Sequence, residues 1–80
     1  MRKRLAILGS TGSVGVNTLE IVQHHPERFA VVGLAAGSNI ELLEQQMRRF
    51  QPSYVSVFDL QRAKELRERT SDLGIEVFEG

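Results

Sequence analysis

Cysteine is absent from the 80-residue sequence, charge of one sign does not prevail, and long apolar runs are missing. Without cysteine there is no disulfide framework, no thiolate nucleophile and no cysteine-based zinc site, which fits a reducing compartment. Ten basic residues balance ten acidic ones, so no broad basic surface indicates a nucleic-acid or membrane partner. The run Leu5–Leu8 is too short for a signal peptide, and no segment is long enough to span a bilayer. We therefore expect a cytoplasmic protein that binds any anion locally.

Short apolar segments alternate with segments of helical period. Apolar residues spaced i, i+3, i+4, i+7 predict a helix that starts near Ser13 and stops before Pro26. Similar stripes predict helices over residues 40–50 and, more loosely, over residues 60–73. The partly β-branched apolar segments between them predict four strands, at Leu5–Leu8, Phe29–Ala36, Tyr54–Phe58 and Ile75–Phe78.

The predicted element order is β-α-β-α-β-α-β. Strands that are separated by single helices pair in parallel through right-handed crossovers, so the fold class is α/β, a Rossmann-like doubly wound parallel sheet. The first two strands are almost continuously apolar, as in sheets covered on both faces, whereas Ser56 interrupts the third strand and suits an edge. This pattern predicts the strand order 3-2-1-4. We expect residues 1–80 to be the amino-terminal part of a nucleotide-binding domain, with the catalytic and carboxy-terminal domains absent from this chain.

Three glycines follow the first predicted strand at regular intervals, in the segment Gly9–Gly15. At this point the chain must turn sharply, let a charged ligand approach the backbone and start a helix close to the strand, and Gly9, Gly12 and Gly15 suit these three needs. The helix that starts near Ser13 offers unpaired N–H groups to a pyrophosphate, and Thr11 adds a hydroxyl. A tight turn that binds no ligand is the alternative.

The second predicted strand ends without an acidic residue. Dinucleotide domains that prefer NAD carry Asp or Glu there for the ribose 2′-hydroxyl, whereas this chain continues as Gly37-Ser38-Asn39. The absence of a carboxylate favours NADP, whose 2′-phosphate those residues would receive at the start of the second helix. Ser38 has an equally good alternative role, because Ser38 and Glu41 match a capping box.

The segments GSTGSVGVNTLEIV, HHPERFAVVGLAAGSN and QPSYVSV together resemble the amino-terminal NADPH-binding region of the 1-deoxy-D-xylulose 5-phosphate reductoisomerase family. The resemblance implies that the chain binds NADPH through its two turns. In the family a basic residue often stands between the glycine and asparagine of the second turn, where this chain has Ser38, so the charge that would pair with the 2′-phosphate is missing. The cofactor-binding residues expected from the turns and the resemblance are Gly9, Thr11, Gly12, Ser13, Val14, Gly37, Ser38 and Asn39.

The resemblance also implies an activity for the whole protein. Such enzymes rearrange and reduce 1-deoxy-D-xylulose 5-phosphate to 2-C-methyl-D-erythritol 4-phosphate in non-mevalonate isoprenoid biosynthesis, with NADPH and Mg²⁺ or Mn²⁺. The expected partner is thus a sugar phosphate, the expected assembly of the full-length protein is a homodimer, and the metal ligands are expected outside this chain. Two alternatives stay open: another NADP-dependent reductase, similar to semialdehyde dehydrogenases, and a non-catalytic nucleotide-sensing module.

No catalytic or metal-binding residue is predicted within the chain, and we expect residues 1–80 alone to be inactive. His24 and His25 are adjacent on a helix and point about 100° apart, so solvation explains them better than metal binding. Asp59 is expected to cap the third helix. The pair Glu44–Arg48 is expected on the surface of the second helix and the pair Glu65–Arg69 on that of the third. The aromatic residues are expected to pack in the interior, namely Phe29, Phe50, Tyr54, Phe58 and Phe78.

Overall fold

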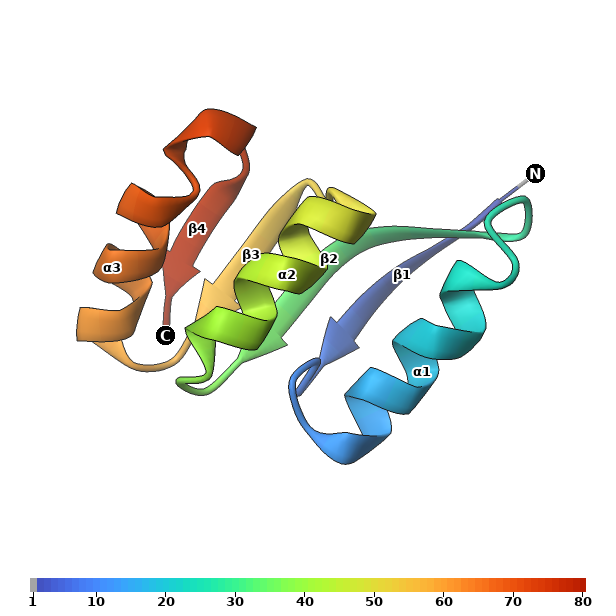
Figure 1. The fold of residues 1–80 in the computed structure, drawn as a ribbon, viewed down its shortest axis with the longest axis horizontal. Helices are drawn as coiled ribbons and strands as arrows, with labels where there is room; N and C mark the ends of the chain where they lie inside the picture. The colour runs from blue at the N-terminus through green and yellow to red at the C-terminus, as the bar shows by residue number, and fades with distance from the viewer. Residues whose placement is uncertain (1) are drawn as a thin grey trace.

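The computed structural model describes residues 2–80 and confirms the predicted alternation of strands and helices (Figure 1). Boundaries differ from the expected ones by one or two residues, apart from a break in the third helix. The elements are β1 (Lys3–Leu8), α1 (Ser13–Gln23), β2 (Phe29–Ala36), α2 (Ile40–Phe50), β3 (Tyr54–Val57), α3 (Leu60–Arg69), the short 3₁₀ helix η1 (Ser71–Leu73) and β4 (Glu76–Glu79).

The four strands form one parallel sheet in the order β1-β2-β3-β4, so the predicted order 3-2-1-4 is wrong. In the structure β4 pairs with β3, with Val77 opposite Val55, and β1 has no second neighbour within residues 2–80. Ser56 therefore lies on an inner strand, and its hydroxyl donates to the Gly80 carbonyl at 2.8 Å. The polar alternation of β3 reflects an exposed sheet face and not an exposed sheet edge.

All three helices cover the same face of the sheet (Figure 1). This follows from the strand order, because right-handed crossovers that always step in one direction return on one side. Within residues 2–80 the sheet is thus covered on one face only, and the expectation of a doubly wound sheet does not hold for them. Leu8, Tyr54 and Phe78 are large apolar residues that are exposed where the buried residues of their strands face the helices.

The core lies between this sheet and α2, which is the central helix. Ile40, Leu43 and Met47 follow a helical spacing along α2 and are fully buried against Leu34 of β2 and Val55 of β3. Burial of each such side chain contributes roughly 1.5–3 kcal/mol. The second helix is therefore the best anchored of the three.

Side chains and backbone turns define where the helices begin and end. The capping box that was one of two alternatives for Ser38 does not form, since α2 is capped by Asn39, whose Oδ1 accepts from the Leu42 N–H at 3.2 Å. The predicted cap at Asp59 is confirmed by its bond from the Arg62 N–H at 3.1 Å. The third helix ends at Arg69 and not at residue 73, because the backbone of Thr70 leaves the helical conformation and η1 follows. No helix within residues 2–80 is long and apolar enough to cross a membrane.

Arg48 connects α2 to the segment that follows α3. Its guanidinium contacts the carboxylate of Asp72 at 2.8 Å and that of Glu44 at 3.1 Å, and it also donates to the Arg69 carbonyl. The hydrogen bonds from Arg48 hold the pKa of the Asp72 carboxyl below its usual range. The predicted surface pairs Glu44–Arg48 and Glu65–Arg69 are both present, at 3.1 and 3.7 Å.

Candidate cofactor-binding site

The carboxyl ends of the first three strands lie at one edge of the sheet. Leu8 at the end of β1 is opposite Ala35 of β2, and Ala36 is opposite Val57 at the end of β3. The turn after β1 and the turn after β2 therefore emerge side by side (Figure 1). The eight residues predicted for the cofactor from two separate segments are brought to the same edge, which is where open parallel sheets bind ligands.

The first turn is built closely around its glycines. Gly9 has a φ of 66°, which is in the left-handed region, and its carbonyl accepts from the Gly12 N–H at 3.0 Å. Gly15 is buried against the turn, and a Cβ atom there would stand 2.6 Å from the Ser10 Cα. A Cβ on Gly12 would meet only the Gly9 carbonyl oxygen, at 3.4 Å. Gly9 and Gly15 thus satisfy internal needs, while the space beside Gly12 is open.

The amino-terminal end of α1 is open to a ligand. Its N-cap is Gly12, which has no side chain to accept from the helix, and the first turn contains no acidic residue. Within residues 2–80 the backbone N–H groups of Thr11, Ser13 and Val14 have no hydrogen-bond acceptor. Ser13 and Val14 are exposed, and Thr11 is half-buried. These donors and the helix dipole are suited to a phosphate-bearing ligand.

The second turn offers both donors and space. Gly37, Ser38 and Asn39 are all exposed. Because Asn39 caps the helix through its oxygen, the Ser38 hydroxyl is free for a ligand and the Asn39 amide nitrogen can donate. One carboxylate lies nearby, since the Asp59 N–H donates to the Gly37 carbonyl at 3.1 Å, but its side chain accepts from the Arg62 N–H on α3.

Phe58 also lies at this edge of the sheet, although it was expected to pack in the interior. Its N–H donates to the Ala36 carbonyl at 3.0 Å, which fixes the residue beside the second turn, and its side chain is 78% exposed. The packing predicted for Phe29 and Phe50 is confirmed, because both lie against the core, but that predicted for Phe58 is wrong. The alternation of the third strand was the available signal, since it places residue 58 on the side of Ser56 and not on that of the buried Val57. An exposed ring there suits the stacking of a flat base.

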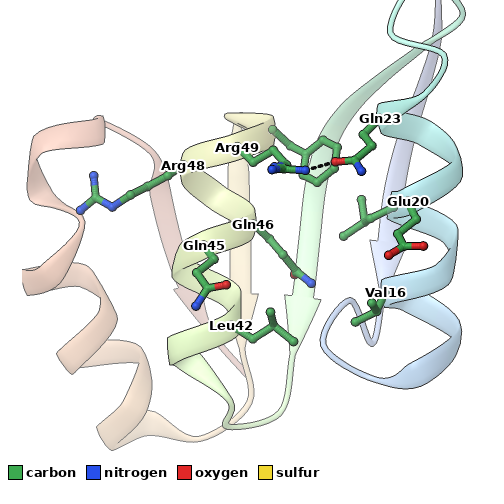
Figure 2. Close-up of a pocket in the computed structure, with 10 residues that line it drawn as sticks. Val16, Glu20, Gln23, Leu42, Gln45, Gln46, Arg48 and Arg49 are labelled. Atoms are coloured by element: carbon green, nitrogen blue, oxygen red, sulfur yellow. Dashed lines mark hydrogen bonds between the residues drawn. The ribbon is translucent and has the colours of Figure 1, made fainter.

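Gln46 also contacts the first turn and was missed because glutamine on a helix normally indicates solvent. It lines a groove of about 660 Å³ between α1 and α2, and Figure 2 shows its side chain pointing from α2 toward α1. The Gln46 Nε2 donates to the Ser10 carbonyl at 2.7 Å, and both residues are buried. Arg49 of α2 and Gln23 of α1 are bonded across the same groove. None of the eight predicted cofactor-binding residues lines it.

Both histidines have local contacts at the end of α1. The N–H of His24 caps the end of α1, and His25 faces the carboxylate of Glu27 at 3.8 Å. Within residues 2–80 there is no group of three or more His, Cys, Asp or Glu side chains that could hold a metal ion.

The sequence that forms these two turns and the sheet matches a family of known proteins. The family model of 1-deoxy-D-xylulose 5-phosphate reductoisomerase matches residues 5–80. The chain belongs to this reductoisomerase family. Membership favours the reductoisomerase over the semialdehyde-dehydrogenase-like alternative.

Individual relatives within the reductoisomerase family agree. The 1-deoxy-D-xylulose 5-phosphate reductoisomerase of Geobacter metallireducens is 53% identical over 78 residues, covering 98% of this chain and 20% of the relative. The Zymomonas mobilis enzyme, solved in complex with NADPH, superposes with a TM-score of 0.94 at 25% identity, over 100% of this chain and 21% of that one. A reductoisomerase solved with NADPH, fosmidomycin and magnesium superposes with a TM-score of 0.92 at 30% identity, over 98% of this chain and 19% of that one. The chain thus spans about a fifth of the length of these reductoisomerases.

Proposed function

We propose that residues 1–80 form the amino-terminal part of the NADPH-binding domain of a reductoisomerase. The observation that carries the proposal is the uncapped start of α1 beside the open space at Gly12, at the edge where the second turn also emerges. Family membership supports the same assignment.

The two turns divide the cofactor between them. The unpaired N–H groups of Thr11, Ser13 and Val14 bind the pyrophosphate, and the glycines let it approach the backbone. The Ser38 hydroxyl and the Asn39 amide bind the 2′-phosphate of the adenosine half. Bound NADPH supplies the hydride of the reaction, while the residues of this chain hold and orient it.

The substrate and metal belong to the remainder of the proposed enzyme. We infer that the full-length protein converts 1-deoxy-D-xylulose 5-phosphate to 2-C-methyl-D-erythritol 4-phosphate with Mg²⁺ or Mn²⁺, as a cytoplasmic homodimer. The described residues supply neither a metal-ligand cluster nor a side chain suited to polarise the sugar phosphate. By themselves they should therefore bind NADPH weakly and turn over no substrate.

Calorimetric titration of a full-length reductoisomerase containing this segment tests the assignment. NADPH should bind more tightly than NADH, and Gly12→Val should weaken both, since a branched side chain would fill the space for the pyrophosphate. Equal affinities would remove the proposed preference for NADP, and unchanged binding by Gly12→Val would show that the turn is only architectural.

A second experiment separates the enzyme from the nucleotide-sensing alternative. NADPH oxidation that depends on both the sugar phosphate and Mg²⁺ supports the reductoisomerase. Tight NADPH binding by the full-length protein without any such turnover would favour a sensing module.

A further inference from the structure

We infer that Gln46 is a positioning residue for the cofactor, because its side chain sets the direction in which the Thr11 N–H points. This inference rests on the proposed function, since it concerns how the first turn presents its donors to NADPH. Gln46 itself lies outside the turn and does not belong to the donors that would touch the cofactor.

The contact joins two buried groups that are distant in sequence. Gln46 belongs to α2, the helix with the most firmly packed side chains, and its neighbour Met47 is fully buried. The backbone that carries the Gln46 amide is therefore held in place. From there its Nε2 reaches the Ser10 carbonyl at 2.7 Å. Ser10 has no exposed surface, so solvent cannot replace this donor if it is lost.

The Ser10 carbonyl controls the next N–H group through the geometry of the peptide bond. In a planar trans peptide the C=O and the N–H point in opposite directions, and no peptide bond of the described chain is cis. A Ser10 carbonyl directed inward at Gln46 therefore directs the Thr11 N–H outward. The Ser10 N–H is fixed separately, by its bond to the Ala35 carbonyl at 2.9 Å. Both sides of Ser10 are thus held, and Gln46 holds the side that orients Thr11.

The other amide atom of Gln46 argues against a purely structural role. Its Oε1 is buried and has no hydrogen-bond partner within residues 2–80, and the same is true of the Ser10 Oγ. Unpaired polar atoms in a core lower stability, and an apolar side chain would avoid one of them. Orientation of the Ser10–Thr11 peptide is a benefit that an apolar residue cannot provide.

Gln46→Met tests the contact, because methionine has a similar shape but cannot donate. In a full-length reductoisomerase containing this segment, we expect the Kd for NADPH to rise about tenfold, as for one lost hydrogen bond to phosphate. The KM for the sugar phosphate and the kcat at saturating NADPH should stay within about twofold of the unmodified values, because Gln46 acts only through the turn. The matched control is Gln45→Met, at the exposed neighbouring position that lines the same groove, which should leave the Kd unchanged.

Gln46→Glu provides a second test, because protonation can restore the hydrogen-bond donor within a single variant. A protonated glutamic acid can donate to the Ser10 carbonyl, whereas the carboxylate cannot and would repel it. Relative to the unmodified protein at each pH, NADPH should bind almost normally near about pH 5 and weakly near about pH 8, since burial raises the pKa of a carboxyl. If Gln46→Met fails to fold, this pH profile decides alone.

These experiments distinguish a failure of the role of Gln46 from a failure of the proposed NADPH-binding function. NADPH binding that is the same in the unmodified protein and in folded Gln46→Met, or a Gln46→Glu protein whose relative affinity does not change with pH, overturns the role of Gln46 and leaves the proposed function standing. An unmodified protein that binds no NADPH overturns the proposed function and, with it, this inference.

Discussion

Gly15 lies so close to Ser10 that a Cβ atom added to Gly15 would stand 2.6 Å from the Ser10 Cα and 2.9 Å from the Gly9 carbonyl carbon. Both neighbours are backbone atoms, so neither can rotate away. Gly15→Ala should therefore lower the free energy of unfolding by roughly 1–3 kcal/mol, as overpacking does in other cores. Urea unfolding of the two proteins measures this difference in the free energy of unfolding. Gly37→Ala is the control, since a Cβ at Gly37 meets no atom within 4 Å, and equal losses in both variants would contradict this account.

Ser38 should limit the preference for NADPH. A lysine at this exposed position would add a positive charge beside the 2′-phosphate, so Ser38→Lys should tighten NADPH binding about tenfold and leave NADH binding almost unchanged. Titration of the full-length protein with both cofactors measures the ratio. A parallel gain for NADH would mean that the new charge acts on the pyrophosphate or on the protein as a whole.

Phe58 should contribute to binding of the adenosine half. Because its ring is 78% exposed, Phe58→Ser should hardly change the stability of the fold, yet it should raise the Kd for 2′,5′-ADP about tenfold through lost stacking. Leu60→Ser, at a position that is 62% exposed on the adjacent start of α3, is the matched control. Similar losses for both variants would indicate a general effect on this edge.

The contact between Arg48 and Asp72 should make stability depend on pH in the acidic range. The folded state lowers the pKa of Asp72, so the contact stabilises the fold above the unfolded pKa of about 3.9 and loses this effect as pH falls through the lower folded value. Asp72→Asn should reduce Tm at neutral pH, and the difference should close in acid. Both groups are exposed, so the shift should be small. Glu68→Gln, at another exposed acid, should show no such pH-dependent difference.

The sequence predicted the elements and the two turns because these depend on local signals. Apolar period, Pro26 and the spacing of Gly9, Gly12 and Gly15 all act within a few residues. Strand order depends instead on which edge of a growing sheet the last strand joins, and the pattern around Ser56 could not distinguish an open face from an open edge. Similarly, the residue that caps α2 is decided by where the helix begins. A start one residue earlier would have made Ser38 the cap in place of Asn39.

Contacts between distant segments could not be predicted either, because the sequence signals act only within a few residues. The bond between Gln46 and Ser10 spans 36 positions and joins a residue type that usually faces solvent to a backbone group. Phe58 differs, because it was expected to pack as the last residue of the third predicted strand, whereas in the structure that strand ends at Val57.

The consecutive strand order also has a consequence for how the chain folds. Each strand pairs with the strand that directly follows it in the sequence, so each β-α-β unit closes a short loop and none has to wait for a distant partner. In the order 3-2-1-4, β4 would have had to return to β1 at the other end of the chain. Pairing between consecutive strands gives a lower contact order than the order 3-2-1-4 would, which favours faster folding. During synthesis, β1 and β2 can pair around α1 as they leave the ribosome, and each later helix and strand can add to a sheet that already exists.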